Sequence, residues 1–198
     1  MLFQENSLSL DFTNYKVYGG CLLVAEPFMR DSSFKRSVVL LAIHNDQEGS
    51  LGFIVNKPIK NLYLGDILTS FTNAKEWPVF FGGPVQTSSL FFIHQLGDII
   101  EDSKEVADGI YFGGNPKTVE ELVKREEAAP QDIKFFLGYS GWGKDQLDEE
   151  ILRNSWLVTG TTKDLVFGEC YENKAWQKAA RRTPHFYVAH FPENPEWN

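Results

Sequence analysis

Three glycine-rich breaks, each at the end of an expected strand, constrain this chain more than any other feature. They are Phe81-Gly82-Gly83-Pro84, Phe112-Gly113-Gly114-Asn115-Pro116 and Gly138-Tyr139-Ser140-Gly141-Trp142-Gly143. Glycine adopts positive φ without steric cost, and it lets another backbone or a ligand approach closely. The breaks therefore predict either tight backbone crossings or a surface built from main-chain atoms, and both interpretations stay open at this point.

Size and composition fit one domain of a soluble protein. The chain has 198 residues, of which 42% are hydrophobic, enough to bury most of its extended surface in one core. We expect a single domain over residues 1–198, with 1–17 and 183–198 as terminal extensions. The longest apolar run, Val38–Ile43, is far shorter than the ~20 residues that cross a bilayer. No secretory leader is visible, so we expect a cytoplasmic protein without membrane contact.

The two cysteines argue against a disulfide framework, and the net charge argues against nucleic acid as a partner. Cys21 and Cys170 are too few for a disulfide framework and are expected to be buried as small apolar residues. The formal net charge of −8 disfavours nucleic acid, because non-specific binding requires cations that neutralise phosphates. The one sizeable basic cluster, Lys174–Arg182, is interpreted as the solvated face of a helix, with direct DNA binding as the alternative.

Strand patterns dominate the chain. Ser37–Ile43 is continuously apolar after its first residue and shows no polar alternation, which is typical of a central strand buried on both faces. Turn residues then lead to Leu51–Asn56, and the two runs predict a β-hairpin. Val79–Phe81 and Leu90–His94 predict a second hairpin across the first glycine break.

Three to four helices are expected among the strands. The best-marked helix has Asn115 as a suitable N-cap and Pro116 in its first turn. The others are expected at Leu62–Phe71, from about Asp145, and at Lys174–Arg182. Because strands outnumber helices and the two are interspersed, we expect an α/β (α+β) fold built on a mixed sheet.

Few residues could support catalysis. Ser140 lies in a glycine-rich turn that is similar to a nucleophile elbow, but Trp142 stands where that motif needs its second glycine. His44 and His94 end predicted strands and could supply a base. The alternative is that the glycines only form a tight turn and the histidines only hydrogen-bond at the surface. A small-molecule hydrolase is therefore the second choice of function.

No metal or cofactor is expected. The sequence has no His-x-x-x-His or Cys-x-x-Cys spacing, so converging metal ligands are not indicated. Gly113-Gly114 leads into a helix N-terminus, which could attract an anion. Asn115 would occupy that cap, however, and no phosphate-binding lysine motif accompanies it.

Polar and aromatic residues at strand ends and turns form the preferred candidate site, because ligand pockets gather in such places. The candidates are Asn45, Glu48, Asn56, Lys57, Gly82, Gly83, Tyr139 and Trp142. Trp142 offers a flat apolar face and one N–H donor, which suits a peptide or a ring. We expect a non-catalytic binding or regulatory protein whose partner is a protein or a small molecule, although half of these residues could equally stabilise turns.

Several segments, in order and over about residues 18–182, resemble the YqgE/AlgH family of small bacterial proteins. They are Gly20–Pro27, Phe34–Val39, His44–Gly49, Gly52, Asn56–Pro58, Phe81–Val85, Leu137–Gly143, Gln146-Leu147, Glu149-Glu150 and Trp156-Leu157. The resemblance implies a single α/β domain whose sheet folds towards a pseudo-barrel. It also implies a largely undefined function, with a role in transcriptional regulation attached to one member. The resemblance thus constrains the fold more than the activity.

Overall fold

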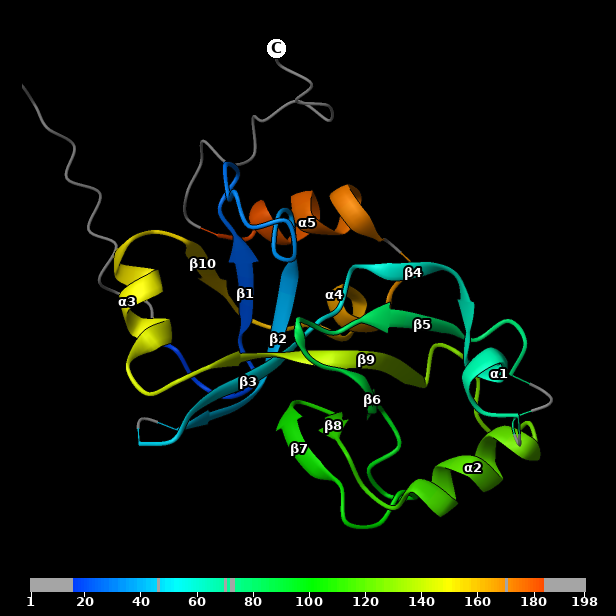
Figure 1. The fold of residues 1–198 in the computed structure, drawn as a ribbon. Helices are drawn as coiled ribbons and strands as arrows, with labels where there is room; N and C mark the ends of the chain where they lie inside the picture. Colours follow the sequence, from blue (N-terminus) through cyan, green and yellow to red (C-terminus); the bar gives the residue numbers. More distant parts are fainter. Residues whose placement is uncertain (1–15, 46, 70, 72–73, 170, 184–198) are drawn as a thin grey trace, which may run out of the picture.

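A large, mostly antiparallel sheet organises the protein in the computed structural model, which describes residues 16–45, 47–69, 71, 74–169 and 171–183 (Figure 1). The predicted terminal extensions fall almost wholly outside these residues, as does Cys170. Ten strands and five helices follow in this order: β1 Leu22–Ala25, β2 Val38–Asn45, β3 Gly49–Ile54, β4 Pro58–Tyr63, α1 Leu64–Ile67, β5 Pro78–Phe81, β6 Val85–His94, β7 Lys104–Ala107, β8 Ile110–Phe112, α2 Pro116–Lys124, β9 Ile133–Trp142, α3 Gln146–Leu152, β10 Trp156–Thr159, α4 Lys163–Phe167 and α5 Glu172–Ala180.

The long strand β9 joins the two halves of the sheet. The strand order is β10-β1-β2-β3-β9-β6-β8-β7, and β5 pairs with both β4 and β9. Residues 140–142 of β9 pair with β3, whereas its first half lies between β5 and β6. The sheet curls enough for β7 to pack against β2, but it is not closed into a barrel. The expected mixed α+β domain is confirmed in this open form.

The first predicted hairpin is confirmed and the second is wrong. β2 and β3 pair antiparallel, with Asn45 opposite Gly49. β5 and β6 do not pair with each other, because β9 lies between them, parallel to β5 and antiparallel to β6. The physical reason lies at Gly82, whose N–H donates to Leu137 O at 2.9 Å and whose C=O accepts from Ile54 N at 3.0 Å. These bonds carry the chain across β9 rather than around a tight turn.

The helices of the described residues differ from expectation at two places, and the second of these raises their number to five instead of three to four. The predicted Leu62–Phe71 helix shortens to α1, because Leu68 is extended (φ −118°, ψ 97°) and ends it. The additional helix, α4, was not predicted. α2 begins as predicted, since the Asn115 side chain accepts a hydrogen bond from Lys117 N.

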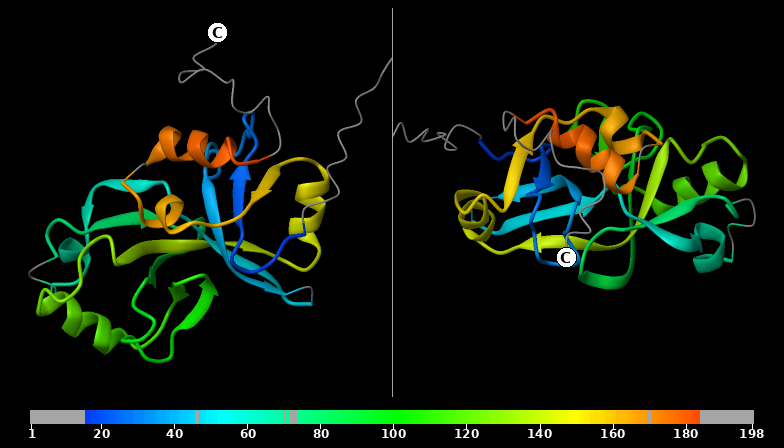
Figure 2. Two further views of the ribbon diagram at one scale, coloured as in Figure 1. Left: turned by 180° about the vertical axis from the view of Figure 1, so that it is seen from behind. Right: turned by 90° about the horizontal axis from the view of Figure 1, so that it is seen from above.

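The central strand β2 is buried on both faces, as its uninterrupted apolar sequence predicted. Val38 and Leu40 face a core that α5 covers with Trp176. Val39 and Leu41 face a second core that contains Trp142 of β9 and Leu147 of α3. Figure 2 shows these helices on opposite sides of the β1–β2 region. The indole N–H of Trp176 donates to the carbonyl of Ala25 in β1 at 2.8 Å, which ties α5 to the sheet.

Candidate functional site

Four of the predicted binding residues line one open groove at the tip of the β2–β3 hairpin. Asn45 and Glu48 come from the hairpin, and Tyr139 and Trp142 from the end of β9. The two segments are brought together because β3 pairs with β9, with Ser50 opposite Trp142. The hollow has a volume of about 350 Å³. The structure therefore gathers residues that lie almost one hundred positions apart in the chain.

The groove has an apolar floor and a polar rim. Ile43, Leu51, Val85 and the ring of Tyr139 are half-buried and line it. Tyr139 is held edge-on by Phe91, with ring centroids 5.6 Å apart. The exposed rim is the hairpin turn, in which Asn45 Oδ1 accepts from Gln47 N at 2.8 Å. The Glu48 carboxylate lies on this rim and is the acidic group of the groove.

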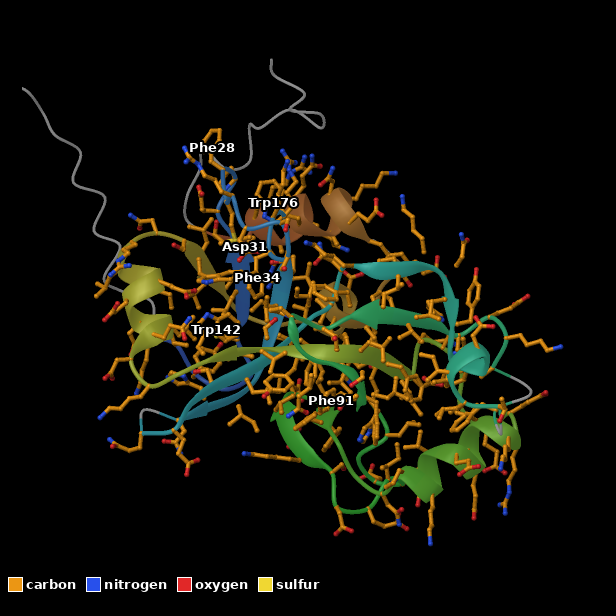
Figure 3. All side chains as sticks on the ribbon, viewed as in Figure 1. Phe28, Asp31, Phe34, Phe91, Trp142 and Trp176 are labelled. Atoms are coloured by element: carbon orange, nitrogen blue, oxygen red, sulfur yellow. The ribbon has the colours of Figure 1, made fainter. Side chains whose placement is uncertain are left out.

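Trp142 contributes less to the groove than its sequence position predicts. Only 5% of it is exposed, and it packs beside α3 (Figure 3). Its indole N–H donates to Glu150 Oε2 at 2.9 Å, and the same oxygen accepts from Trp156 at 2.7 Å. Because the indole N–H already donates to Glu150, the Trp142 side chain has no hydrogen-bond donor left for a ligand in the groove. Sequence analysis named Glu150 only within the family resemblance, so its role between two indoles was missed.

Asn56 and Lys57 lie away from the groove and hold loops together. Asn56 is 1% exposed; its amide accepts from Val38 N at 2.8 Å and donates to Arg36 O and Glu172 O, each at 2.9 Å. Lys57 Nζ donates to Ser33 O at 2.8 Å. Burial lowers the pKa of Lys57, and the charge of Asp31 partly offsets that shift. The two side chains are thus bound to the protein's own backbone.

Gly82 and Gly83 form a tight backbone crossing over β9. A Cβ on Gly82 would lie 2.2 Å from Gly138 O, and one on Gly83 would lie 2.3 Å from Tyr139 C. Gly83 and Gly138 both have positive φ, 151° and 71°. Of the two interpretations of the glycine breaks, the structure favours the crossing at this break, because protein backbone fills the space that a ligand would need.

The three residues of the catalytic alternative do not come together in an accessible cleft. Ser140 is fully buried and its hydroxyl donates to Gly82 O at 3.0 Å. His94 is fully buried too: its Nδ1 accepts from Leu96 N at 3.1 Å, so Nε2 carries the proton that it donates to Gly113 O. Burial lowers the pKa of His94, more than the bond to Gly113 raises it. His44 lies on β2, where its Nδ1 is 2.8 Å from Ser50 Oγ.

A second pocket holds a buried lysine that sequence analysis did not single out. Lys134 on β9 is 4% exposed, and its Nζ donates to Val55 O at 3.0 Å and to Val166 O at the end of α4. Nζ lies 4.2 Å from the centroid of the Phe80 ring and 5.5 Å from that of Tyr171. The signal in the sequence was a lysine inside the apolar strand Ile133–Leu137, where a cation must be compensated from elsewhere in the fold.

The amine of Lys134 forms no ion pair with any carboxylate that the structure describes. Burial therefore acts on it almost unopposed and lowers its pKa from 10.5 to about 7. Tyr171 beside it has a raised pKa through burial and through the charge of Glu169. Glu76 and Glu169 lie at the exposed edge of the same pocket.

The free energy of unfolding is expected to rise with pH in a way that depends on Lys134. The folded protein binds this proton more weakly than the unfolded chain does, so folding releases it between about pH 7 and 10.5. Wild type should gain about 2 kcal/mol between about pH 7 and 9 relative to Lys134→Met. Urea unfolding of both proteins at the two pH values measures the difference. Parallel pH profiles would contradict the assignment, and exposed Lys124→Met serves as the control.

The basic helix face is a mixed-charge surface. Lys174, Lys178, Arg181 and Arg182 are exposed on α5 and just beyond its end, opposite buried Trp176, Ala179 and Ala180. Lys178 forms an ion pair with Asp164 of α4, which neutralises part of this surface. The exposed cations opposite a buried apolar face support the interpretation as a helix face. The ion pair with Asp164 reduces the positive charge that DNA binding would need.

Metal-ligand clusters and membrane-spanning helices are both absent from the residues that the structure describes. No group of three or more His, Cys, Asp or Glu side chains within them is arranged to hold a metal ion. None of their helices has the length and apolar character to span a bilayer. Cys21 is buried, and burial raises the pKa of its thiol.

Known proteins resemble this chain over most of its length. A UPF0301 protein from Chlorobium limicola is 38% identical over 185 residues, covering 92% of this chain and 97% of the relative. A UPF0301 protein from Parabacteroides distasonis is 39% identical and covers 90% of each chain.

Two solved structures share the fold. Protein DIP2367 from Corynebacterium diphtheriae has a TM-score of 0.74 at 20% identity, covering 89% of this chain and 94% of that one. The solution structure of the AlgH protein from Pseudomonas aeruginosa has a TM-score of 0.69 at 24% identity, covering 85% and 92%. A family model described as AlgH-like (DUF179) matches residues 22–187. With this match and these relatives, the chain belongs to the AlgH-like family of UPF0301 proteins.

Proposed function

We propose that this protein is a non-catalytic binding protein that recognises an extended peptide segment of a partner in the groove between the β2–β3 hairpin and β9. The observation that carries the proposal is the convergence of Asn45, Glu48 and Tyr139 around one apolar hollow. Any influence on transcription would then be indirect, through the bound partner. A cytoplasmic location stays a prediction.

The shape of the groove favours a peptide over a small molecule. Small-molecule sites commonly enclose most of the ligand surface, whereas this groove is open and its walls include the main chain of Gly49 and Gly141. A half-buried tyrosine ring supplies apolar contact at low entropic cost. Glu48 on the rim favours a basic residue beside an apolar one in the ligand. The net charge of −8 also favours a basic partner.

The geometry gives less support to the two alternatives. A hydrolase would need a nucleophile and base within hydrogen-bond reach of a substrate, but the Ser140 hydroxyl and the His94 ring are buried and bonded to backbone. DNA binding would need the α5 cations, and Asp164 already pairs with one of them.

The test is selection of a phage-displayed peptide library against the full chain. We expect peptides that place Lys or Arg next to an aromatic or aliphatic residue, and we expect Glu48→Lys to weaken them at least about ten-fold by removing one charge-assisted contact. Glu127→Lys makes the same charge change on an exposed residue beyond α2 and should leave binding unchanged. Equal losses in both variants, or peptides that bind Glu48→Lys as tightly as wild type, would refute the groove assignment.

A further inference from the structure

We propose that the pocket around Lys134 is a covalent binding site for a small, uncharged aldehyde or ketone, which the lysine amine captures as an imine. The pocket has a volume of about 430 Å³ and lies between β5, β9 and the residues Phe167, Glu169 and Tyr171. It is distinct from the peptide groove and shares no lining residue with it. Each of the two proposals can therefore be refuted without refuting the other.

The surroundings of the amine are those of a nucleophile rather than of a structural cation. Phe80, Phe167 and Tyr171 provide aromatic walls for the pocket, and Lys134 lines it among them. A lysine placed only for its charge would be paired with a carboxylate, because an unpaired buried ion is costly. Here Nζ is held by two neutral carbonyl groups, Val55 O and Val166 O. A neutral amine has two N–H bonds, and these two carbonyls accept both.

In the neutral amine, the fourth position of the tetrahedral nitrogen Nζ holds the lone pair. No other hydrogen bond to Nζ occurs among the described residues, and the two rings nearest to Nζ, Phe80 and Tyr171, both line the pocket. Because the pKa of this amine is about 7, about half of it is neutral near pH 7, whereas an ordinary lysine is neutral in roughly 1 molecule in 2,500. Desolvated lysines in apolar pockets are the lysines that form Schiff bases in other proteins.

The reaction balances without an oxidant or reductant. The lone pair of Nζ attacks the carbonyl carbon and a C–N bond forms, while one amine proton moves to the carbonyl oxygen. The C–O bond then breaks, and the oxygen leaves as water with the second amine proton as C=N forms. If the imine takes up a proton, its N–H can again donate to one carbonyl, and its charge lies against the Phe80 ring, a favourable cation–π arrangement.

The rim of the pocket selects against anionic ligands. Glu76 and Glu169 are exposed at its edge, and their negative charges repel an anionic ligand. The aromatic walls favour a ligand with a ring or a short apolar group. The expected class is therefore an uncharged carbonyl compound rather than a phosphorylated or carboxylated one.

The experiment is reductive trapping on the folded, full chain. Wild-type protein is incubated near pH 7 with benzaldehyde and cyanoborohydride, and peptide mass spectrometry gives the labelling rate of each lysine. We expect Lys134 to react at least about ten-fold faster than exposed lysines such as Lys124 and Lys178, since far more of it is neutral. The negatively charged analogue 4-carboxybenzaldehyde should react several-fold more slowly at Lys134 than benzaldehyde, with a much smaller difference at exposed lysines.

The pH profile separates this site from general lysine reactivity. The rate at Lys134 should level off above about pH 7 to 8, as that of a free amine of similar pKa does, while the rates of exposed lysines continue to rise towards pH 10. The variant Lys134→Arg should lose the fast labelling at position 134, and the slower labelling of the exposed lysines should stay unchanged. If Lys134 is no faster than Lys124 in the folded protein, or reacts only in urea, the proposal is wrong whatever the variant does.

Discussion

Gly83→Ala is expected to cost about 4 kcal/mol of unfolding free energy, or to prevent folding. The new methyl carbon would lie 2.3 Å from both the carbonyl carbon and the carbonyl oxygen of Tyr139 and 2.4 Å from the nitrogen of Ser140. All three are backbone atoms of β9, so no side-chain rotation relieves the overlap. The positive φ of Gly83, 151°, adds a conformation that alanine rarely adopts.

The damage should extend beyond one turn, because this crossing aligns both halves of the sheet. Gly82, next to it, bonds to Leu137 in β9 and to Ile54 in β3. Separating the strands would break these bonds and the one from Ser140 Oγ to Gly82 O. Buried donors and acceptors left unpaired cost about 1–3 kcal/mol each.

Urea denaturation followed by tryptophan fluorescence measures the effect. Gly160→Ala is the matched control, because a Cβ there meets nothing within 4 Å and the change should be neutral or slightly stabilising. A stability loss below about 1 kcal/mol in Gly83→Ala would show that the crossing can open without cost and that the close approach does not explain the glycines.

Local patterns in the sequence predicted those elements whose pairing is also local. The uninterrupted apolar run of β2 and the turn residues after it specify a hairpin, because both strands and the turn lie within about twenty residues. Asn115 and Pro116 likewise specify the start of α2 through contacts one turn away. In each case the physics that decides the structure acts between neighbours in the chain.

The order of β5, β9 and β6 could not be obtained in this way. Nothing near Phe81 or Leu90 indicates that a strand from residues 133–142 enters between them, since only the paired backbones reveal it. The same limit applies to the candidate site. Turn chemistry correctly located Asn45 at a strand end and Glu48 in the turn that follows it. The turn predicted at Gly138–Gly143 is wrong, because β9 continues through Tyr139 to Trp142. The register of β3 against β9 is what brings Tyr139 to the hairpin.

Residue type alone does not indicate which polar residues are buried. Asn45 ends β2 and Asn56 lies two residues beyond the end of β3. They are the same amino acid, yet Asn56 is 1% exposed and Asn45 lies on an exposed rim. Lys134 and Lys57 are both lysines bonded to backbone carbonyls, and only the former lies deep enough for its pKa to fall to about 7. Depth is a property of the assembled core, and local sequence does not encode it.

Replacing Asn56 is the second change for which we expect a large loss of stability, and Asn45 provides the comparison. Asn56→Ala should lower the free energy of unfolding by about 3–4 kcal/mol, because it leaves Val38 N–H and two carbonyls, Arg36 O and Glu172 O, without their partner. These three groups belong to β2, the loop before it and α5, so the amide joins parts of the chain that are up to 116 positions apart.

Asn45→Ala removes the same side chain from the hairpin turn and should cost about 0.5–1 kcal/mol, as expected for an exposed turn residue whose bonds water can replace. Thermal or urea unfolding of the two variants in parallel gives the comparison. If Asn56→Ala is as stable as Asn45→Ala and instead weakens the peptides selected on the groove, then Asn56 belongs to the binding surface, as its sequence position first indicated. If it loses stability while the remaining folded protein binds those peptides with unchanged affinity, Asn56 serves the fold, and the binding surface is confined to the hairpin tip and the end of β9.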